Sequence, residues 1–311
     1  MRSWLTRLVL ALMAASVLAV PAAAASQGGP DPAGVILVKG AWASAAGSAS
    51  PLPEDGKIVG SRYANAYFGF EYAFGIDWIE RFEGPPPSDN GYYVLAQIEP
   101  KKPSPDPSMA RVLIAAQDLF FTAAPVRSAF ELLRYRQEHL GAEYQVEHSL
   151  RMVRIANRDF ARFDYLAPQA GLHWHVLATE IRCHVVEFIF TGSDARSLEK
   201  LTGNMKATIE PMGNAPVCLK GFADSDTVLT REDPVLSQPR FNPVPVRIVI
   251  DKEGKVSQIH FLSAFPEQAR NIADALLQWR FKPYLVNGEP VEVETGLTFG
   301  RSPQANNGAL H

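Results

Sequence analysis

The sequence has few cysteines and no large excess of either charge. Its 311 residues include two cysteines, and the formal net charge at pH 7 is -3. Two cysteines cannot build a disulfide scaffold, and so small a charge predicts no strong attraction to nucleic acid or to an anionic membrane surface. With 20% charged and 47% hydrophobic residues, the composition is that of a folded soluble protein, and the length favours two modest domains.

The sequence also lacks the short motifs that carry common catalytic chemistry. It contains no Gly-x-Ser-x-Gly elbow, no His-Glu-x-x-His zinc helix and no glycine loop that would cradle phosphate. Asp159 and Asp164 are flanked by Arg158 and Arg162, which indicates a salt-bridged sheet face rather than an acid/base pair. We therefore expect no catalytic residue and no cofactor.

Three histidines are the candidates for a metal site. His173 and His175 are two positions apart on a predicted strand, so their side chains share one face. Together with His184 on the next predicted strand they would offer three nitrogens, as in a metalloenzyme. The alternative is ordinary packed histidines. Since no cysteine or carboxylate stands at ligand spacing, the sequence favours packing and predicts no metal.

The first 25 residues have the pattern of a secretory signal peptide. Arg2 and Arg7 precede the apolar run 8–20, and the alanines at 22–25 offer an Ala-x-Ala cleavage site. The run is short for a membrane span, although an uncleaved anchor is the alternative. We expect a periplasmic or secreted protein of the bacterial envelope, without a stable membrane span after cleavage. In that compartment Cys183 and Cys218 form either one disulfide or two buried thiols.

Residues 26–60 are rich in Ala, Ser, Gly and Pro and predict a flexible tether. Aromatic and alternating runs over 61–212 predict an antiparallel sheet with two helices on one face. Its opening, Tyr63-x-Asn65-x-Tyr67-Phe68-Gly69-Phe70 followed by Trp78, resembles PsbP-type secreted domains. That resemblance implies a curved antiparallel sheet flanked by helices.

A proline-rich linker is expected over 213–239, followed by a compact module over 240–300 and a disordered tail over 301–311. Val246, Ile248 and Ile250 alternate with other residues along a predicted strand, and a return strand and an apolar helical stripe follow. With Trp279-Arg280-Phe281-Lys282-Pro283-Tyr284, Asn287-Gly288 and Phe299, this order resembles the TonB C-terminal domain family. The fold class expected is thus α+β, with two small modules.

The TonB resemblance implies a non-catalytic protein that binds a partner, often by adding an extended segment to a sheet edge. The predicted edge is the last strand, and its candidate binding residues are Val291, Val293, Thr295, Leu297 and Phe299. The alternative is that the linker or a second copy of the chain covers this edge. The expected partners are envelope proteins, with an outer-membrane receptor or a second copy of the chain as candidates.

A rival hypothesis is a secreted protein that binds a small molecule or lipid. Its pocket would lie between the sheet and the helices of the first module. The residues expected to line it are aromatic: Phe70, Tyr72, Trp78, Phe120 and Phe163.

Overall fold

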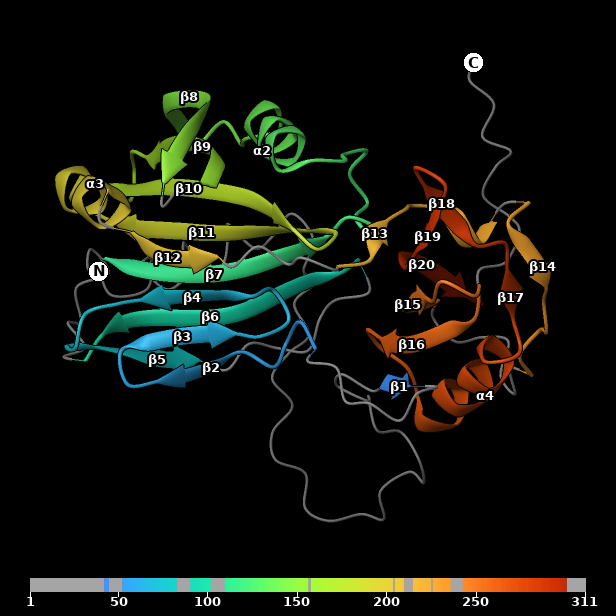
Figure 1. Ribbon diagram of the computed structural model, residues 1–311. Coiled ribbons are helices and arrows are strands. Elements are labelled where there is room, and N and C mark those ends of the chain that lie inside the picture. Colours follow the sequence, from blue (N-terminus) through green and yellow to red (C-terminus); the bar gives the residue numbers. More distant parts are fainter. Residues whose placement is uncertain are drawn as a thin grey trace, which may run out of the picture.

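The computed structural model describes residues 42–44, 52–82, 90–101, 110–155, 158–203, 205–209, 215–224, 226–235 and 243–300. The predicted signal peptide and C-terminal tail lie outside these residues. The described chain is mixed α+β, as expected: it is rich in sheet and contains three α-helices (Figure 1). These are α2 (Ala129–Glu138), α3 (Ala195–Gly203) and α4 (Pro266–Leu276), with a 3-10 turn η1 (Phe222–Asp224).

The largest sheet has seven antiparallel strands in the order β5-β6-β7-β11-β10-β9-β8. Its strands are β5 (Trp78–Phe82), β6 (Tyr92–Pro100), β7 (Arg111–Asp118), β8 (Gln145–Ile155), β9 (Arg158–Ala167), β10 (Leu172–Ile181) and β11 (His184–Gly192). The strands β9, β10 and β11 have long runs of buried residues, because apolar clusters cover both of their faces. The sequence did not predict β8. Most of its side chains are exposed, so it carries little of the apolar alternation by which buried strands are recognised.

A four-stranded sheet packs on one face of this large sheet. Its order is β12-β4-β3-β2, with β2 (Lys57–Val59), β3 (Arg62–Asn65), β4 (Phe70–Ala73) and β12 (Lys206–Ile209). The rings of Phe70 and Tyr72 both contact Phe188 of β11, with centroids 5.6 Å apart. The two sheets therefore share one apolar core.

The two helices expected on one face lie on opposite faces instead. Leu198 of α3 belongs to the core between the two sheets, together with Phe160 of β9. Leu133 of α2 packs with Phe163 of β9 in a separate cluster. Because Phe160 and Phe163 are an odd number of positions apart on one strand, they point to opposite faces. The sequence showed each helix's apolar stripe but not which face it would cover.

The C-terminal sheet has five strands in the order β1-β16-β15-β20-β13. They are β1 (Trp42–Ser44), β13 (Val217–Cys218), β15 (Val244–Ile250), β16 (Val256–Phe261) and β20 (Val293–Phe299). Val246, Ile248 and Ile250 face α4 and form a core with its Ile272 and Leu276. The predicted strand, return strand and helix of this segment are all present.

Short strands complete this part of the chain: β14 (Val228–Thr230) pairs with β17 (Arg280–Phe281), and β18 (Tyr284–Val286) pairs with β19 (Glu289–Val291). Part of the expected linker packs here, because Phe222 belongs to the apolar core of the C-terminal sheet. Part of the expected tether also lies in strands, namely β1 and β2. The sequence did not predict these two short strands, because prolines and small residues lie near them and backbone hydrogen bonds need no apolar side chain. In the described residues no helix is long and apolar enough to cross a membrane.

Candidate functional site

The face of the C-terminal sheet that is opposite α4 lies against one end of the seven-stranded sheet. Residues that alternate with the apolar positions of β15 and β20 lie on this face, and two of them are Arg247 and Glu294. Opposite them are Asp118, the last residue of β7, and Arg182, in the turn between β10 and β11. We call Asp118, Arg182, Arg247 and Glu294 the buried ionic cluster.

The buried ionic cluster holds two acidic and two basic side chains in direct contact. Arg247 pairs through Nη1 with Oδ2 of Asp118, and its Nη2 lies 2.9 Å from Oε1 of Glu294. Nε of Arg182 lies 3.4 Å from Oε2 of Glu294. The hydroxyl of Tyr67 donates to Oε1 of Glu294 at 3.1 Å. The charges balance, which a cluster removed from water requires.

Burial and pairing act against each other on the pKa values of this cluster. Burial alone would lower the pKa of Arg247, but Asp118 and Glu294 outweigh it and raise that pKa well above its ordinary value. Burial alone would raise the pKa of Glu294, but Arg247 and Arg182 hold it below its ordinary value. Burial raises the pKa of Asp118 against the opposing pull of Arg247. Arg247 and Glu294 are therefore charged at neutral pH.

His184 lies beside the cluster as a neutral imidazole. Its Nδ1 is 2.7 Å from the carbonyl oxygen of Arg182, which places the ring proton on that nitrogen. Aromatic rings surround it, with the centroid of Phe68 5.0 Å away. Burial, together with the charge of Arg247, lowers the pKa of His184 well below its ordinary value. The histidine therefore adds no positive charge to the cluster.

Gly296 of β20 allows the two sheets to approach closely. A Cβ atom at this position would lie 2.6 Å from Cβ of Phe120 and 3.0 Å from Cζ of Phe121. The guanidinium of Arg247 stacks over the ring of Phe120 at 4.7 Å from its centroid. Any side chain at Gly296 would push the C-terminal sheet away from β7, and so would separate Arg247 from Asp118.

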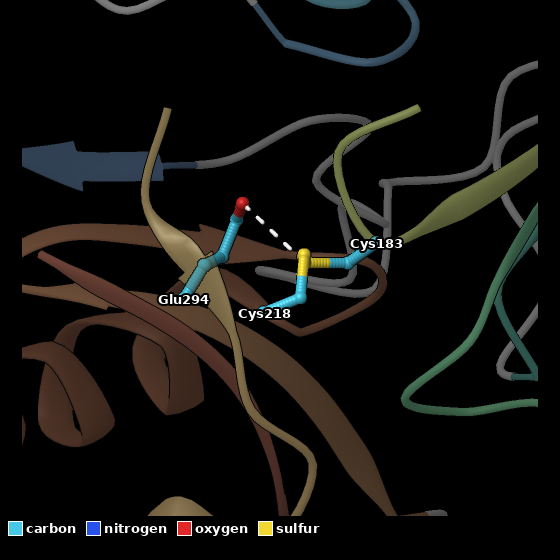
Figure 2. Close-up of side chains that lie close together, drawn as sticks. All are labelled: Cys183, Cys218 and Glu294. Atoms are coloured by element: carbon cyan, nitrogen blue, oxygen red, sulfur yellow. Dashed lines mark hydrogen bonds between the residues drawn. A yellow bond between two sulfur atoms is a disulfide. The ribbon is translucent and has the colours of Figure 1, made fainter. Parts of the chain in front are cut away.

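A disulfide between Cys183 and Cys218 crosslinks the two sheets next to the cluster (Figure 2). Their Cα atoms are 5.6 Å apart, within the ordinary range. Of the two alternatives left open by the sequence, the structure contains the disulfide. Cys183 is buried and Cys218 is exposed, and Sγ of Cys183 lies 3.9 Å from Oε2 of Glu294.

The same three residues are the group among the described residues whose ligand atoms could meet at a metal ion, since they lie within 4.8 Å of one another. In the disulfide form both sulfurs are bonded to each other and cannot act as thiolates. The carboxylate of Glu294 is held by two arginines, whose charges repel a cation. The residues therefore do not fit a metal in this state.

A small cavity of about 20 Å³ lies at the cluster, lined by Tyr67, Arg182, Arg247, His260 and Glu294 among others. This volume counts only the space open to the centre of a water molecule, and about 10–15 Å³ of such space is enough for one water. The cavity can hold a water that bridges polar groups, but it is too small for an organic ligand.

The three histidines that were the candidates for a metal site do not lie together. His173 contacts Oε2 of Glu147 at 2.7 Å, whereas His175 is buried beside Arg162, 3.1 Å from its Nη2. His184 pairs with Ile181 at the far end of β10 from both. The three therefore lie in separate environments, with local partners of their own, and a shared metal or active centre built from them is wrong.

The predicted partner-binding strand is paired along one edge and at the first two residues of the other edge. Residues 293–299 form β20, which pairs with β15 on one side and, at Val293 and Glu294, with β13 on the other. The side chains of Val293, Thr295, Leu297 and Phe299 are buried, and Val291 lies in β19 instead. The sequence could not show that residues 217–218, in the expected linker, return to pair with the first two residues of this edge.

The aromatic residues of the rival pocket do not line one cavity. Phe70 and Tyr72 pack between the two sheets with partly buried Trp78, whereas Phe163 lies on the opposite face of the large sheet. Phe120 lies against Gly296 at the contact with the C-terminal sheet. The structure thus gives these five residues separate packing roles.

The residues of the buried ionic cluster were missed by the sequence reasoning. Arg247 alternates with apolar residues and reads as a solvent-facing position, and Glu294 reads likewise. Asp118 is 129 positions from its partner, a separation that local periodicity cannot bridge. A signal was available in Cys183 and Cys218, because a disulfide between them would bring the expected linker next to the first sheet.

No protein-family model matches this chain. No curated protein matches it either. Among solved structures, the chain is similar to the solution structure of cyanobacterial PsbP (CyanoP) from Synechocystis sp. PCC 6803, at 13% identity and a TM-score of 0.33, over 48% of this chain and 94% of that one. It is also similar to a crystal structure from Bacteroides thetaiotaomicron VPI-5482, at 16% identity and a TM-score of 0.28, over 48% of each chain.

The first of these structures belongs to the PsbP family, which the motif beginning at Tyr63 also resembles. TM-scores this low decide neither a shared fold nor a shared function. The comparisons give no evidence for a TonB C-terminal domain, so that resemblance stays a prediction.

Proposed function

We propose that this protein is a non-catalytic interaction protein of the bacterial envelope, and that its C-terminal sheet binds an extended segment of another envelope protein at the outer edge of β16. The observation that carries the proposal is the position of β1. This strand pairs antiparallel with β16, with Trp42 opposite His260, Ala43 opposite Ile259 and Ser44 opposite Gln258.

The pairing of β1 marks β16 as an accepting edge. An edge strand presents unpaired N–H and C=O groups, and another extended segment satisfies them regardless of its sequence. β1 is three residues long, while β16 spans six residues. A longer partner segment would make more backbone hydrogen bonds than β1 does, and so could displace it.

The other edge of the sheet favours this choice of β16. There β13 pairs with β20 and is fixed by the disulfide at Cys218. A partner that paired along the whole of β20 would have to displace this covalently held strand at Val293 and Glu294. At β16 it competes only with three residues of a segment whose composition predicts a tether.

Two variants of the full chain, with opposite expected effects, test the proposal. Deletion of residues 42–44 should increase capture of a partner, because it leaves the β16 edge unpaired. A crosslink between Ser44→Cys and Gln258→Cys, which are opposite each other in the register, should hold β1 in place and abolish capture. Ser44→Cys alone is the control and should behave as the wild type.

Capture is measured with a photo-crosslinking amino acid at Ser257 in β16, in the native envelope, followed by identification of the attached protein. The proposal requires the yield of one envelope protein to rise on deletion and to fall on crosslinking. An equal yield in all variants would overturn it. If the attached protein is a second copy of this chain, and the deletion variant dimerises in solution, the occupant is the chain itself and the proposal of a separate partner is wrong.

A further inference from the structure

The disulfide of the C-terminal sheet has one accessible end and one protected end. Cys218 is exposed on β13, whereas Cys183 is 7% exposed. Thiol–disulfide exchange begins when a thiolate attacks one sulfur of the bond, so access decides which sulfur is attacked. Only the Cys218 end is open to a thiolate from solution.

Cys183 also lies in a strained turn. Ile181 pairs with His184, so Arg182 and Cys183 form a two-residue hairpin turn, with φ of 48° and 61°. Turns of this type favour Asn and Gly, because other residues are strained at positive φ. Arg182 is held by Glu294 and by the ring of Tyr67, 4.0 Å from its guanidinium, and Cys183 by the disulfide. Strained and exposed disulfides are the ones that exchange readily.

Glu294 acts in the opposite direction, by protecting the bond. Its Oε2 lies 3.9 Å from Sγ of Cys183, and a neighbouring negative charge disfavours a thiolate. When Cys218 is attacked, Cys183 is the leaving group and must carry that charge. The carboxylate therefore makes Cys183 a poorer leaving group and favours the closed disulfide.

From this geometry we propose that the Cys183–Cys218 bond is a site of reversible thiol–disulfide exchange, at which an external thiol forms a mixed disulfide with Cys218. The thiolate of the external thiol bonds to Sγ of Cys218, the Cys183–Cys218 bond breaks, and Cys183 leaves with the electron pair and takes a proton from water. With a dithiol, its second sulfur attacks the external sulfur of the mixed disulfide and releases Cys218. The protein then gains two electrons and two protons, and the dithiol becomes a disulfide.

Exchange would release β13 from its crosslink. Only two residues of this strand pair with β20, and the backbone hydrogen bonds at its ends run from Val217 N–H to the carbonyl of Glu292 at 2.8 Å and from Leu219 N–H to the carbonyl of Glu294 at 3.0 Å. So short a pairing is weak without a covalent anchor. Reduction therefore loosens the cover of β20, while the buried ionic cluster still joins the two sheets. This inference does not depend on the proposed partner at β16.

The first experiment treats the native, oxidised full chain with excess reduced glutathione, quenches with acid, alkylates free thiols under denaturing conditions and maps both cysteines by mass spectrometry. The expected result is glutathione on Cys218 and an alkylated thiol on Cys183. An adduct on Cys183, an equal distribution, or no adduct until denaturant is added would overturn the proposal.

The second experiment measures the equilibrium with a glutathione redox buffer in Glu294→Gln. Loss of the carboxylate should shift the equilibrium toward the reduced form by about tenfold, because the two arginines would then stabilise the Cys183 thiolate. Glu292→Gln, the same change two positions away, is the matched control and should not shift it. An unchanged equilibrium in a folded Glu294→Gln protein contradicts the protective role; if that variant does not fold, the glutathione mapping decides.

The third measurement is amide hydrogen exchange at Val217 and Leu219 before and after reduction of the full chain. Both amides should exchange at least about tenfold faster after reduction, while the amide of Leu177, within β10, should keep its rate. Unchanged rates at Val217 and Leu219 would show that the bond does not hold β13 in place.

Discussion

Arg247 of β15 makes a buried ion pair with Asp118 at the end of β7, across 129 positions of sequence. Arg247 is 2% exposed and Asp118 is fully buried. In an isolated C-terminal sheet, Arg247 would lie on the face away from α4 and would contact water. Contact with the seven-stranded sheet removes Arg247 from water. Loss of either Arg247 or Asp118 would therefore leave a buried charge without its partner and weaken the contact between the two sheets.

Replacement of Arg247 with Met should destabilise the protein by about 3–5 kcal/mol, because it leaves Asp118 and Glu294 buried without their shared cation. Urea unfolding of the full chain under oxidising conditions measures the change. Arg270→Met, at an exposed position of α4, is the control and should change the free energy of unfolding by less than about 0.5 kcal/mol. If the two variants change the free energy of unfolding equally, the ion pair between Arg247 and Asp118 does not contribute to stability.

Gly296→Ala should cost about 1–3 kcal/mol, because the new Cβ would lie 2.6 Å from Cβ of Phe120. Gly203→Ala is the matched control, since a Cβ there meets no atom within 4 Å. Thermal unfolding compares the two variants. The remaining contact is with Cζ of Phe121, the far end of a side chain, and a small shift of that side chain can relieve it. A second substitution, Phe120→Gly, should therefore recover part of the loss in Gly296→Ala. If the double variant loses as much stability as the two single substitutions together, the contact between Gly296→Ala and Phe120 is not the cause of the loss.

The C-terminal sheet shows what local pattern can predict. Val246, Ile248 and Ile250 alternate along β15, and the stripe of α4 that contains Ile272 and Leu276 meets them in one core. These elements follow from periods of two and 3.6 residues, which the sequence displays directly.

Other features depend on contacts that no local period encodes. β13 lies in an expected linker, and its pairing with Val293 and Glu294 covers one end of the strand that the sequence offers as an edge. Arg247 alternates correctly, but its burial depends on Asp118, which belongs to the other sheet. The sequence therefore predicts which residues of a strand share a face, but only the structure shows which element packs against that face.

Removal of the disulfide should destabilise the protein even if the fold is kept. The bond closes a loop with a sequence separation of 35 residues, for which the chain-entropy model gives about 3–4 kcal/mol. The variant with Cys183→Ser and Cys218→Ser should lose about this amount in urea unfolding. The wild-type protein measured in dithiothreitol is the control and should show the same loss. A double variant as stable as the oxidised protein would contradict this.

The contribution of two buried histidines to stability should fall as the pH is lowered below about 6.5, the ordinary pKa of histidine. Burial lowers the pKa of His184 and of His175 in the folded protein, so below that pH the unfolded chain binds more protons than the folded one. Each histidine then costs up to about 1.4 kcal/mol per pH unit, until the pH reaches its folded pKa. The loss is thus on the acid side, and no loss from these groups is expected above pH 7.

The variant His184→Asn separates this effect from other acid-sensitive groups. An amide keeps a donor for the carbonyl of Arg182 but cannot take up a proton near neutral pH. Between pH 7 and pH 5 the variant should lose about 2 kcal/mol less than the wild type in urea unfolding, although it starts from a lower stability because ring contacts are lost. His139→Asn, at an exposed position of the chain, is the control and should keep the wild-type slope. A His184→Asn protein with that same slope would mean that His184 is protonated in the folded state, beside Asp118.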